Sequence, residues 1–509
     1  AEKARSLGAL AGDEQAQEAA RLANEFNPVL RTHDRYGNRT DWVEFHPAWH
    51  QLMSWAFGHE VHSLAWTARQ PGGHFARAVQ SYLWNQVENG VGCPTGMAYA
   101  ACAGFAGRPE LAPWREKTLS SRYDARRLPI EQKTGAVIGY AMTEKQGGSD
   151  LRQTQTTGVF AGTEGAATVY LLTGHKWFFS VPVADGFYTL AQTPGGVSCF
   201  FVPRFLPDGA MNRVFIQRLK DKCGNRSNAS SEVEFNKTWA ILVAEEGRGI
   251  REILSHAHLT RLDFAVGSAG LMRHALTLAI HHASTRSGFG VRLSQLPMQA
   301  NVLADLALES EAATLSALRV ARATDAMATD TNERLLARVA TPVVKFWNCQ
   351  RAACFTYEAL QVHGGNGFIM EHPMARLYRE APLNSIWEGT SNMMCMDVLR
   401  ALRREEGSLE AFMNEVSASG SATTAHAAFL ASLHVDLSAT DIDEGNARSL
   451  VTRMALALQA SELIKYSPEG VALRFIESRL GGRHAGVIGT LPAGKDLGDI
   501  VQRAAVAPR

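Results

Sequence analysis

Three segments rich in Val, Thr, Phe and Tyr decide the fold: ATVYLLTG (167–174), DGFYTLAQT (185–193) and VSCFFVP (197–203). Gly, Pro and Asn turns separate them from each other and from a fourth such segment, SEVEFNKTW (231–239). Short apolar runs between turn residues are typical of neighbouring β-strands. We therefore predict a small antiparallel β domain in the middle of the chain.

Helical patterns flank this β segment on both sides. Up to about residue 137 the sequence is rich in Ala, Leu, His and Trp between loop signals, which predicts a helical domain. Further on, we expect long helices at roughly 252–285, 298–327, 332–362 and 391–405, and four such helices predict a bundle. An apolar stripe marks the first of them: Leu271, Met272, Ala275, Leu276, Ala279 and Ile280.

The predicted fold class is α+β and mostly α. The tail opens with GSLEAFMNEVSASGSATT (407–424), which we interpret as a linker, and a further helix is expected around 445–465. The predicted domains are an N-terminal helical domain, 1–137; an antiparallel β domain, 138–245; a four-helix bundle, 246–406; and a C-terminal helical extension, 407–509.

Composition excludes several classes of function. The 509 residues carry 51 Lys plus Arg against 50 Asp plus Glu, so charge gives no global reason to seek nucleic acid or an anionic membrane. Seven cysteines form no C-x-x-C pair, which indicates reduced thiols and a cytoplasmic protein. The sequence shows no secretory signal, no apolar run of about 18 residues that could span a membrane, and no metal-ligand spacing.

Two clusters in the β segment have a ligand-binding composition. In TEKQGGSD (143–150), a Gly pair between hydroxyl side chains lets a flat or anionic ligand approach the backbone, although a polar turn is the better explanation of this cluster taken alone. In GHKWFFSV (174–181), strand alternation places Phe178 and Ser180 on one face, which suits a planar ring but is also compatible with core. No G-x-G-x-x-G follows a strand, so any cofactor is expected between domains.

Two further clusters lie in the helical part. In RSGFG (286–290), a guanidinium beside a Gly turn can bind a diphosphate, or is simply an exposed Arg at a helix end. In NSIWEGTSN (384–392), Glu388 stands between Trp387 and Gly389, before residues that favour a helix N-cap. Burial there would raise the pKa of the Glu388 carboxylate above about 4.3, whereas the helix N-terminus favours its ionised form. A carboxylate that acts as a catalytic base is compatible with both effects.

Five motifs in one order resemble the acyl-CoA dehydrogenase superfamily of FAD enzymes: YAMTEKQGGSD, GHKWFFS, RSGFG, QVHGGNGF and IWEGTSN. The flanking stretches FHPAWH, SCFFVPRFLPDG and LKDKCGNRSNAS resemble its AidB-like branch, the DNA-alkylation-response flavoproteins. The resemblance covers nearly the whole chain and implies the acyl-CoA dehydrogenase-like fold, FAD as cofactor and a homotetramer.

The resemblance also implies roles for individual residues. Ser149 is expected to line the acyl-thioester arm, and Arg261 to face the ligand. The positions that match cofactor-binding residues of the family, some of them toward the FAD of a neighbouring subunit, are Met142, Thr143, Ser149, Phe178, Phe179, Ser180, Arg286, Phe289, Gln361, Gly364, Gly365, Trp387, Thr390 and Asn392.

Glu388 matches the catalytic base, which in the family removes the α proton of an acyl-CoA thioester while the β hydrogen leaves as hydride to the flavin. Some relatives carry the base one residue before a retained arginine, but Thr260 stands there in this sequence, ahead of Arg261. Phe178 replaces a common tryptophan, and Trp387 replaces a smaller tyrosine, which we expect to narrow the acyl pocket.

Three functions follow from this interpretation. The first is an FAD-dependent acyl-CoA dehydrogenase that passes electrons to an electron-transfer flavoprotein. The second is an AidB-like damage-response protein that binds double-stranded DNA with little dehydrogenase activity; Arg474, Arg479 and Arg483 are the notable basic cluster of the tail. The third is a non-catalytic acyl-CoA-binding sensor.

Overall fold

A computed structural model describes residues 1–439, 442–482, 486–494 and 496–506. The chain divides into two compact units, Ala1–Thr260 and Arg261–Arg509. The division falls inside one long helix, α8 (Gly249–Thr285), and the four predicted domain boundaries stay predictions. Among the described residues, no helix combines the length and apolar character that a membrane crossing requires.

The first unit opens with helices, as predicted, and with a hairpin that the helical pattern did not indicate. The hairpin pairs β1 (Val29–His33) with β2 (Arg39–Glu44) in antiparallel register. Its polar, alternating sequence has no apolar face wide enough to stand out among helices. The helices are α1 (Glu2–Ala11), α2 (Glu14–Glu25), α3 (Pro47–Gly58), α4 (Leu64–Thr67), α5 (Gly73–Trp84), α6 (Gly92–Gly104) and α7 (Ala112–Thr118).

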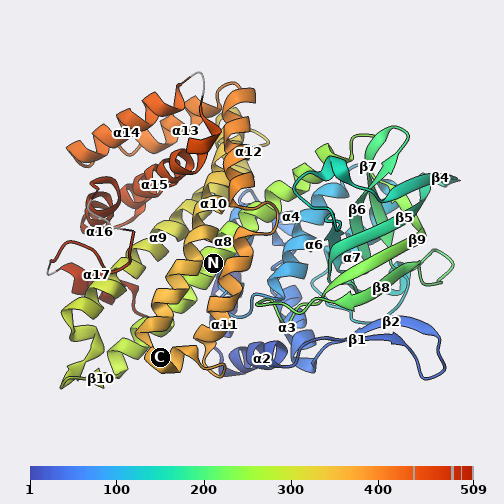
Figure 1. Ribbon diagram of the computed structural model, residues 1–509, viewed down its shortest axis with the longest axis horizontal. Helices are drawn as coiled ribbons and strands as arrows, with labels where there is room; N and C mark the ends of the chain where they lie inside the picture. Colours follow the sequence, from blue (N-terminus) through green and yellow to red (C-terminus); the bar gives the residue numbers. More distant parts are fainter. Residues whose placement is uncertain (440–441, 483–485, 495, 507–509) are drawn as a thin grey trace. The chain divides into compact units, whose positions relative to one another are not determined.

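The predicted β domain forms one sheet (Figure 1). Its strands are β3 (Ile138–Ala141), β4 (Thr157–Glu164), β5 (Ala167–Ser180), β6 (Gly186–Thr193), β7 (Gly196–Pro203), β8 (Val214–Leu219) and β9 (Ser230–Leu242). The order is β3-β6-β4-β5-β9-β7, and β7 pairs with β6 as well as β9, so the sheet closes on itself. Most pairs are antiparallel, as predicted; the exceptions are at β6, with which β3 and β4 each pair in parallel.

The core of this unit lies between the sheet and the helices α6 and α7. Phe105 and Trp114 from the helical side contact Phe201 on β7, and Tyr188 on β6 packs against the same ring. These side chains are at most 8% exposed. Burying aromatic residues of this size contributes roughly 1.5–3 kcal/mol each, which fixes the sheet against the helices.

The second unit is helical apart from the small hairpin of β10 (Ser287–Gly288) and β11 (Val291–Arg292). Its helices, after the rest of α8, are α9 (Pro297–Ala326), α10 (Thr331–Val362), α11 (Pro373–Glu380), α12 (Ser391–Arg404), α13 (Ser408–Ser417), α14 (Thr424–Leu437), α15 (Ala447–Tyr466), α16 (Glu469–Phe475) and α17 (Asp496–Ala504). The long helices thus lie within a few residues of their predicted ranges. The apolar stripe on α8 is fully buried, as its spacing predicts.

Buried polar groups fix the long helices in register. The side-chain amide of Asn348 on α10 donates to the carbonyls of Ala265 on α8 (3.4 Å) and Ala313 on α9 (3.0 Å). One residue on, Cys349 accepts a hydrogen bond from the hydroxyl of Ser268 at 3.3 Å. Because a buried polar group without a partner costs about 1–3 kcal/mol, these bonds penalise any sliding of the helices.

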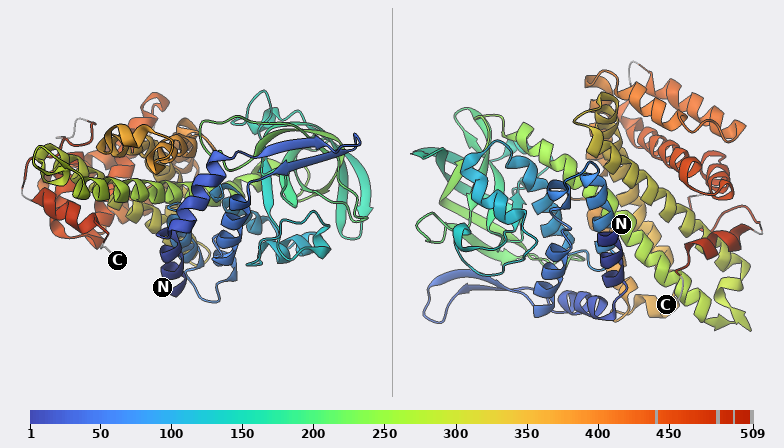
Figure 2. Two further views of the ribbon diagram at one scale, coloured as in Figure 1. Left: turned by 90° about the horizontal axis from the view of Figure 1, so that it is seen from below. Right: turned by 180° about the vertical axis from the view of Figure 1, so that it is seen from behind.

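The predicted linker at 407–424 is wrong in its first half, which forms α13. Phe412 and Val416 are fully buried, and packing of these apolar residues overrides the Ser- and Ala-rich composition. A buried guanidinium ties this helix to the bundle: Arg319 on α9 binds Glu333 at 2.8 Å and Glu415 on α13 at 2.6 Å. In Figure 2, α15 runs beside α9, and the two helices contact each other.

A buried ion pair joins the turn at 143–150 to β5. The ammonium of Lys176 lies 2.7 Å from a carboxylate oxygen of Glu144, and both side chains are at most 1% exposed. The hydroxyl of Thr156 (2.6 Å) and the backbone N–H of Gln155 (2.7 Å) also donate to this carboxylate. Burial raises the pKa of Glu144, but these donors outweigh it and bring the pKa down to about 2.

We predict that Lys176→Met lowers the free energy of unfolding by about 3–5 kcal/mol at pH 7, because the variant leaves the Glu144 carboxylate buried without its cation. The double variant Glu144→Gln/Lys176→Met should recover part of this loss. Urea unfolding followed by circular dichroism measures both, with Arg334→Met on the exposed face of α10 as the control. Equal loss in Lys176→Met and the control would contradict the interpretation.

The pH dependence of this contribution has a definite sign. The folded pKa of Glu144 is about 2 and its ordinary value is 4.5, so the carboxylate stabilises the fold above pH 4.5. That stabilisation is lost as the pH falls from 4.5 toward 2. We expect the difference in unfolding free energy between the wild type and the double variant to shrink over this range.

Candidate functional site

Two of the clusters singled out in the sequence lie together at one end of β5. The backbone carbonyl of Thr143 accepts a hydrogen bond from the N–H of Trp177 at 2.8 Å, and the imidazole of His175 accepts one from the N–H of Lys145 at 2.9 Å. A Cβ at Gly148 would lie 2.5 Å from the Thr143 hydroxyl, so the turn needs glycine there. Ser149 is exposed beyond this turn, and Met142 packs partly into the core.

The aromatic cluster divides between surface and core. Phe178 is 47% exposed, whereas Phe179 is fully buried and packs on Phe187 with ring centroids 4.3 Å apart. Ser180 is half-buried, and its hydroxyl lies 3.4 Å from that of Ser230. The ring of Phe178 and the hydroxyl of Ser180 are both accessible, and their contact with a flat ligand stays a prediction. The side chain of Phe179 belongs to the core, so the predicted ligand contact there is limited to backbone.

The side chain of Lys220 lies against the aromatic rings of this cluster. The ammonium of Lys220 lies 3.2 Å from the centre of the Trp177 ring and 4.9 Å from that of Phe178. It also forms an ion pair with Glu232 at 2.6 Å. A cation over the ring faces fixes their orientation by about 0.5–1 kcal/mol at a partly exposed position. The sequence pattern did not single out Lys220, since it lies about 40 residues after Trp177 in the sequence.

The RSGFG segment follows α8 and forms the turn between β10 and β11. Phe289 and Gly290 both have positive φ, at 54° and 85°, which is the backbone of a two-residue hairpin turn. Phe289 is 95% exposed, and Arg286 is exposed beside it. The Phe289 ring is therefore accessible to a ligand or to another subunit.

The HGGNGF segment follows the end of α10 and forms a short 3₁₀ helix, Gly364–Phe368. Gly364 has φ 59°, in the left-handed region, and Gly364 and Gly365 are exposed. The side-chain amide of Gln361 donates to Glu358 at 3.0 Å and is also exposed. The backbone at this end of α10 is therefore open to a ligand.

The carboxylate predicted as the base lies in a strained turn. Glu388 has φ 54° and Gly389 has φ 103°, between the short helix Ala381–Ser385 and α12. The left-handed region costs a residue with a Cβ about 1–2 kcal/mol, and such strain persists where surrounding structure enforces it. A Cβ at Gly389 would lie 2.6 Å from the Met394 side chain, so no other residue fits there without displacement.

Two cations enforce the turn through its carbonyl groups. The ammonium of Lys345 on α10 donates to the carbonyls of Trp387 (3.0 Å) and Gly389 (2.5 Å). The guanidinium of Arg261 on α8 donates to the carbonyl of Glu388 at 3.1 Å and forms an ion pair with Asp397 at 2.8 Å. Burial lowers the pKa of Lys345, which is fully enclosed. Sequence reasoning named Arg261 as facing the ligand but missed Lys345.

The residues beside Glu388 follow the predicted pattern. The Trp387 ring stacks on Phe264 with centroids 4.3 Å apart and planes 19° from parallel, and α12 begins at Ser391 with Thr390 as its N-cap residue. The side chain of Thr390 makes no capping bond, so its hydroxyl is available to a ligand. The side chain of Asn392 accepts a hydrogen bond from Arg448 at 3.2 Å.

The described arginines of the basic cluster in the tail form ion pairs within the protein. Arg474 binds Asp496 at 2.5 Å, and Arg479 binds Asp305 and lies 3.1 Å from Glu309. Arg483, the third member, lies outside the described residues. Ion-paired guanidinium groups offer little charge to a polyanion, so this cluster lends no support to a DNA-binding surface.

Three sequence families match successive parts of the chain. Residues 1–125 match the adaptive response protein AidB N-terminal domain, residues 139–238 the middle domain of acyl-CoA dehydrogenases, and residues 247–403 their C-terminal domain. Putative acyl-CoA dehydrogenase AidB of Escherichia coli K12 is 48% identical over 408 residues, which are 79% of this chain and 74% of that protein. Acyl-CoA dehydrogenase family member 11 of Caenorhabditis elegans is 27% identical over 79% and 67%.

Solved structures share the fold. C. elegans ACDH-11 in complex with C11-CoA superposes with a TM-score of 0.82 at 24% identity and covers 96% of this chain and 84% of that chain. The acyl-CoA dehydrogenase of Bacillus anthracis, complexed with FAD, has a TM-score of 0.71 at 16% identity, with coverage of 99% and 90%. Together with the family matches and the 48% identical relative, these likenesses show that the chain belongs to the acyl-CoA dehydrogenase family, in its AidB-like branch.

Proposed function

We propose that this protein is an FAD-dependent acyl-CoA dehydrogenase that removes hydrogen from the α and β carbons of an acyl-CoA thioester, with Glu388 as the base. The observation that carries the proposal is the turn of Glu388, whose strained backbone is held by Lys345 and Arg261. Strain enforced by a buried ammonium and a partly buried guanidinium around one carboxylate supports a catalytic group rather than a structural acid.

The residues of the chain fit FAD as cofactor. Phe178 presents a half-exposed ring with the hydroxyl of Ser180 two residues on, a surface that suits the flat flavin ring. Arg286 is exposed next to a Gly turn, and Thr390 stands uncapped at a helix start, both suited to phosphate oxygens. When bound, FAD supplies the acceptor for the electron pair that leaves the β carbon with its hydrogen.

The chain itself supplies proton transfer and positioning. A carboxylate oxygen of Glu388 takes the α proton, and the electron pair of that C–H bond becomes the new Cα=Cβ bond. Such general-base catalysis typically contributes 10²- to 10⁴-fold, provided that the carboxylate is held at the reacting carbon. Lys345 and Arg261 donate to backbone carbonyls of the Glu388 turn, so they act as positioning residues that fix where Glu388 points.

The size of the Trp387 side chain affects which acyl groups fit beside Glu388. The indole stacks on Phe264, so its position is fixed and it takes space beside the base. Its Nε1–H is buried, has no hydrogen-bond partner among the residues that the structure describes, and can donate to a ligand oxygen. We propose that this bulk restricts the acyl group near the reacting carbons, which keeps a low-activity or sensor role open as an outcome of the experiments below.

The proposed assembly is a homotetramer that passes its electrons to an electron-transfer flavoprotein. Phe289, 95% exposed on the rigid β10–β11 turn, supports burial against a second subunit or its cofactor. Light scattering during gel filtration tests the assembly: the proposal expects the mass of four chains, and a monomer would contradict it. Reduction of added electron-transfer flavoprotein tests the electron partner.

Glu388→Gln is predicted to lower the rate of flavin reduction by an acyl-CoA at least 100-fold, because the amide cannot accept the α proton. The purified yellow protein is titrated anaerobically with short, branched and long acyl-CoA thioesters while flavin absorbance is recorded. Glu388→Asp, which keeps a carboxylate, should retain measurable reduction. Bleaching at the wild-type rate in Glu388→Gln would exclude Glu388 as the base, and unchanged absorbance of the wild type across all thioesters would favour the sensor.

Lys345→Met is predicted to lower the rate constant of flavin reduction about 10- to 100-fold, because the Glu388 turn loses two charge-assisted hydrogen bonds and shifts. The dissociation constant of the acyl-CoA should change only a few-fold, since Lys345 is enclosed under the turn. Stopped-flow reduction at several substrate concentrations separates these two quantities. The exposed variant Arg334→Met, on the same helix, should match the wild type; a loss confined to substrate affinity would contradict a positioning role.

A further inference from the structure

Asp397, in the second turn of α12, binds guanidinium groups from two other helices. One oxygen of its carboxylate accepts a hydrogen bond from Arg261 on α8 at 2.8 Å, and the other accepts one from Arg338 on α10 at 2.9 Å. The exposed fraction of the side chain is 10% for Asp397 and 13% for Arg261. The charges of this enclosed pair therefore act on their surroundings with little screening by water.

Arg261 connects this carboxylate to the turn of the proposed base. Its Nε–H donates to the carbonyl of Glu388 at 3.1 Å, while its Nη1–H binds Asp397. Because a guanidinium group is planar and rigid, two bonds to different nitrogens fix its orientation. Asp397 therefore acts on the Glu388 turn through Arg261.

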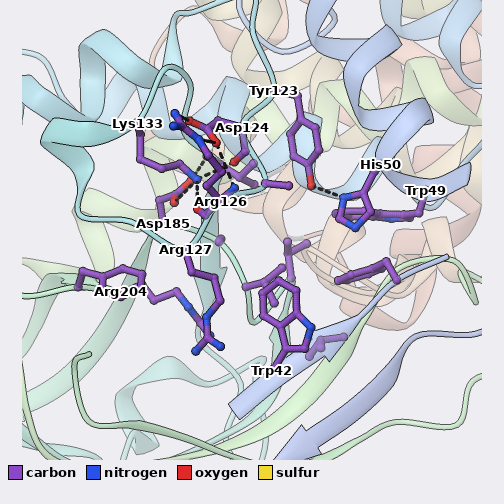
Figure 3. Close-up of a pocket in the computed structure, with 18 residues that line it drawn as sticks. Trp42, Trp49, His50, Tyr123, Asp124, Arg126, Arg127, Lys133, Asp185 and Arg204 are labelled. Carbon is purple, nitrogen blue, oxygen red and sulfur yellow. Dashed lines mark hydrogen bonds and ion pairs between the residues drawn. The ribbon is translucent and has the colours of Figure 1, made fainter. Parts of the chain in front are cut away.

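An ion pair in the first unit shows how a carboxylate that anchors the backbone is bound (Figure 3). Asp185 pairs with Lys133 at 2.9 Å, and it also accepts a hydrogen bond from the backbone N–H of Val137 at 2.9 Å. Asp397, in contrast, accepts its side-chain hydrogen bonds from two guanidinium groups. Its effect is therefore on charge and on the orientation of Arg261.

The charges around the Glu388 turn act on one another. Burial has the largest effect on the pKa of Lys345 and lowers it; the charge of Arg261 lowers it further, whereas the charge of Glu388 raises it. Arg338 lies seven positions, or about two turns, before Lys345 on α10, so both side chains lie on the same face of that helix. The cations of this cluster thus come from one helix face and from Arg261.

Two carboxylates offset part of this positive charge. Asp397 pairs with Arg261, and Glu405, whose side chain is 33% exposed, pairs with Arg338 at 2.7 Å. The guanidinium of Arg400 also lies 3.6 Å from Asp397, but its side chain is 49% exposed, so solvent screens its charge. Without Asp397, Arg338 keeps its bond to Glu405, whereas Arg261 loses this carboxylate.

We propose that Asp397 sets how strongly Glu388 binds a proton, because it offsets the charge of the guanidinium that holds the Glu388 turn. This inference rests on the proposed function, in which Glu388 is the base. A nearby cation favours the ionised form of a carboxylate and so makes it a weaker base. Asp397 is thus a positioning residue that lets Arg261 donate to the turn while limiting this effect.

Two substitutions that change the charge in opposite directions test the proposal. Asp397→Asn keeps the shape and removes a negative charge, so the pKa of Glu388 should fall by about 0.5–1. Arg338→Met removes a cation bound to the same carboxylate, so the pKa of Glu388 should rise by a similar amount. Both variants break an ion pair, and damage to packing alone would not give shifts of opposite sign.

The pKa of Glu388 is measured on the full-length protein from the pH dependence of its labelling by a water-soluble carbodiimide with glycinamide, which requires the protonated carboxyl group. Mass spectrometry quantifies the labelled peptide, and Glu388→Gln identifies its signal. Glu406→Gln, which removes an exposed acid just after α12, is the control and should leave the pKa unchanged. The rate constant of flavin reduction by an acyl-CoA, measured against pH, should rise at lower pH in Asp397→Asn and at higher pH in Arg338→Met than in the wild type.

An unchanged pKa of Glu388 in both variants, or shifts in the same direction, overturns the proposal. Circular dichroism checks that the variants are folded; if Asp397→Asn is not, Arg338→Met decides alone, because the proposal requires a rise there. The labelling needs neither turnover nor an acyl-CoA. A wild type that does not reduce its flavin therefore contradicts the proposed function, while the labelling still decides the role of Asp397.

Discussion

The hydrogen bonds from Lys345 and Arg261 to three successive carbonyl groups are the constraint on which the proposed chemistry of this protein depends. They hold Glu388 in a backbone conformation that costs about 1–2 kcal/mol for a residue with a Cβ. Burying an ammonium group adds a further cost, which lowers the pKa of Lys345. In the proposed role these costs have a function, because a base must be held within a fraction of an ångström of its target.

A buried lysine also fixes a turn in the first unit. The ion pair of Glu144 and Lys176 joins the 143–150 turn to β5, so that the Gly-rich backbone and the aromatic face of Phe178 are held as one surface. In both units a buried lysine under a turn fixes the backbone, and the groups that would contact a ligand stay partly exposed. The rigid part of each site thus lies beneath its binding surface, which favours pre-organisation.

Most of the fold could be predicted from local sequence patterns, and most of what could not depends on contacts between distant residues. The spacing of apolar residues predicted the first and last residues of α8, α9 and α10 to within a few positions, because this periodicity indicates which face of a helix is buried. The same composition argument failed for α13, where burial of Phe412 overrides a linker-like sequence. At the site, the motif predicted that a helix starts just after Glu388, but it did not indicate the positive φ of Glu388. It could not indicate Lys345 either, because Lys345 lies 43 positions before Glu388 and no short-range pattern joins them.

The central claim is that Glu388 is a base held at the α carbon of an acyl thioester, and exchange of the α hydrogen with solvent tests it most directly. The protein is incubated anaerobically with an acyl-CoA in D₂O, and deuterium at the α carbon is measured by mass spectrometry. The account predicts exchange catalysed by the wild type and at least 100-fold slower exchange with Glu388→Gln. Equal exchange rates for the two proteins, or none with the wild type, would contradict it.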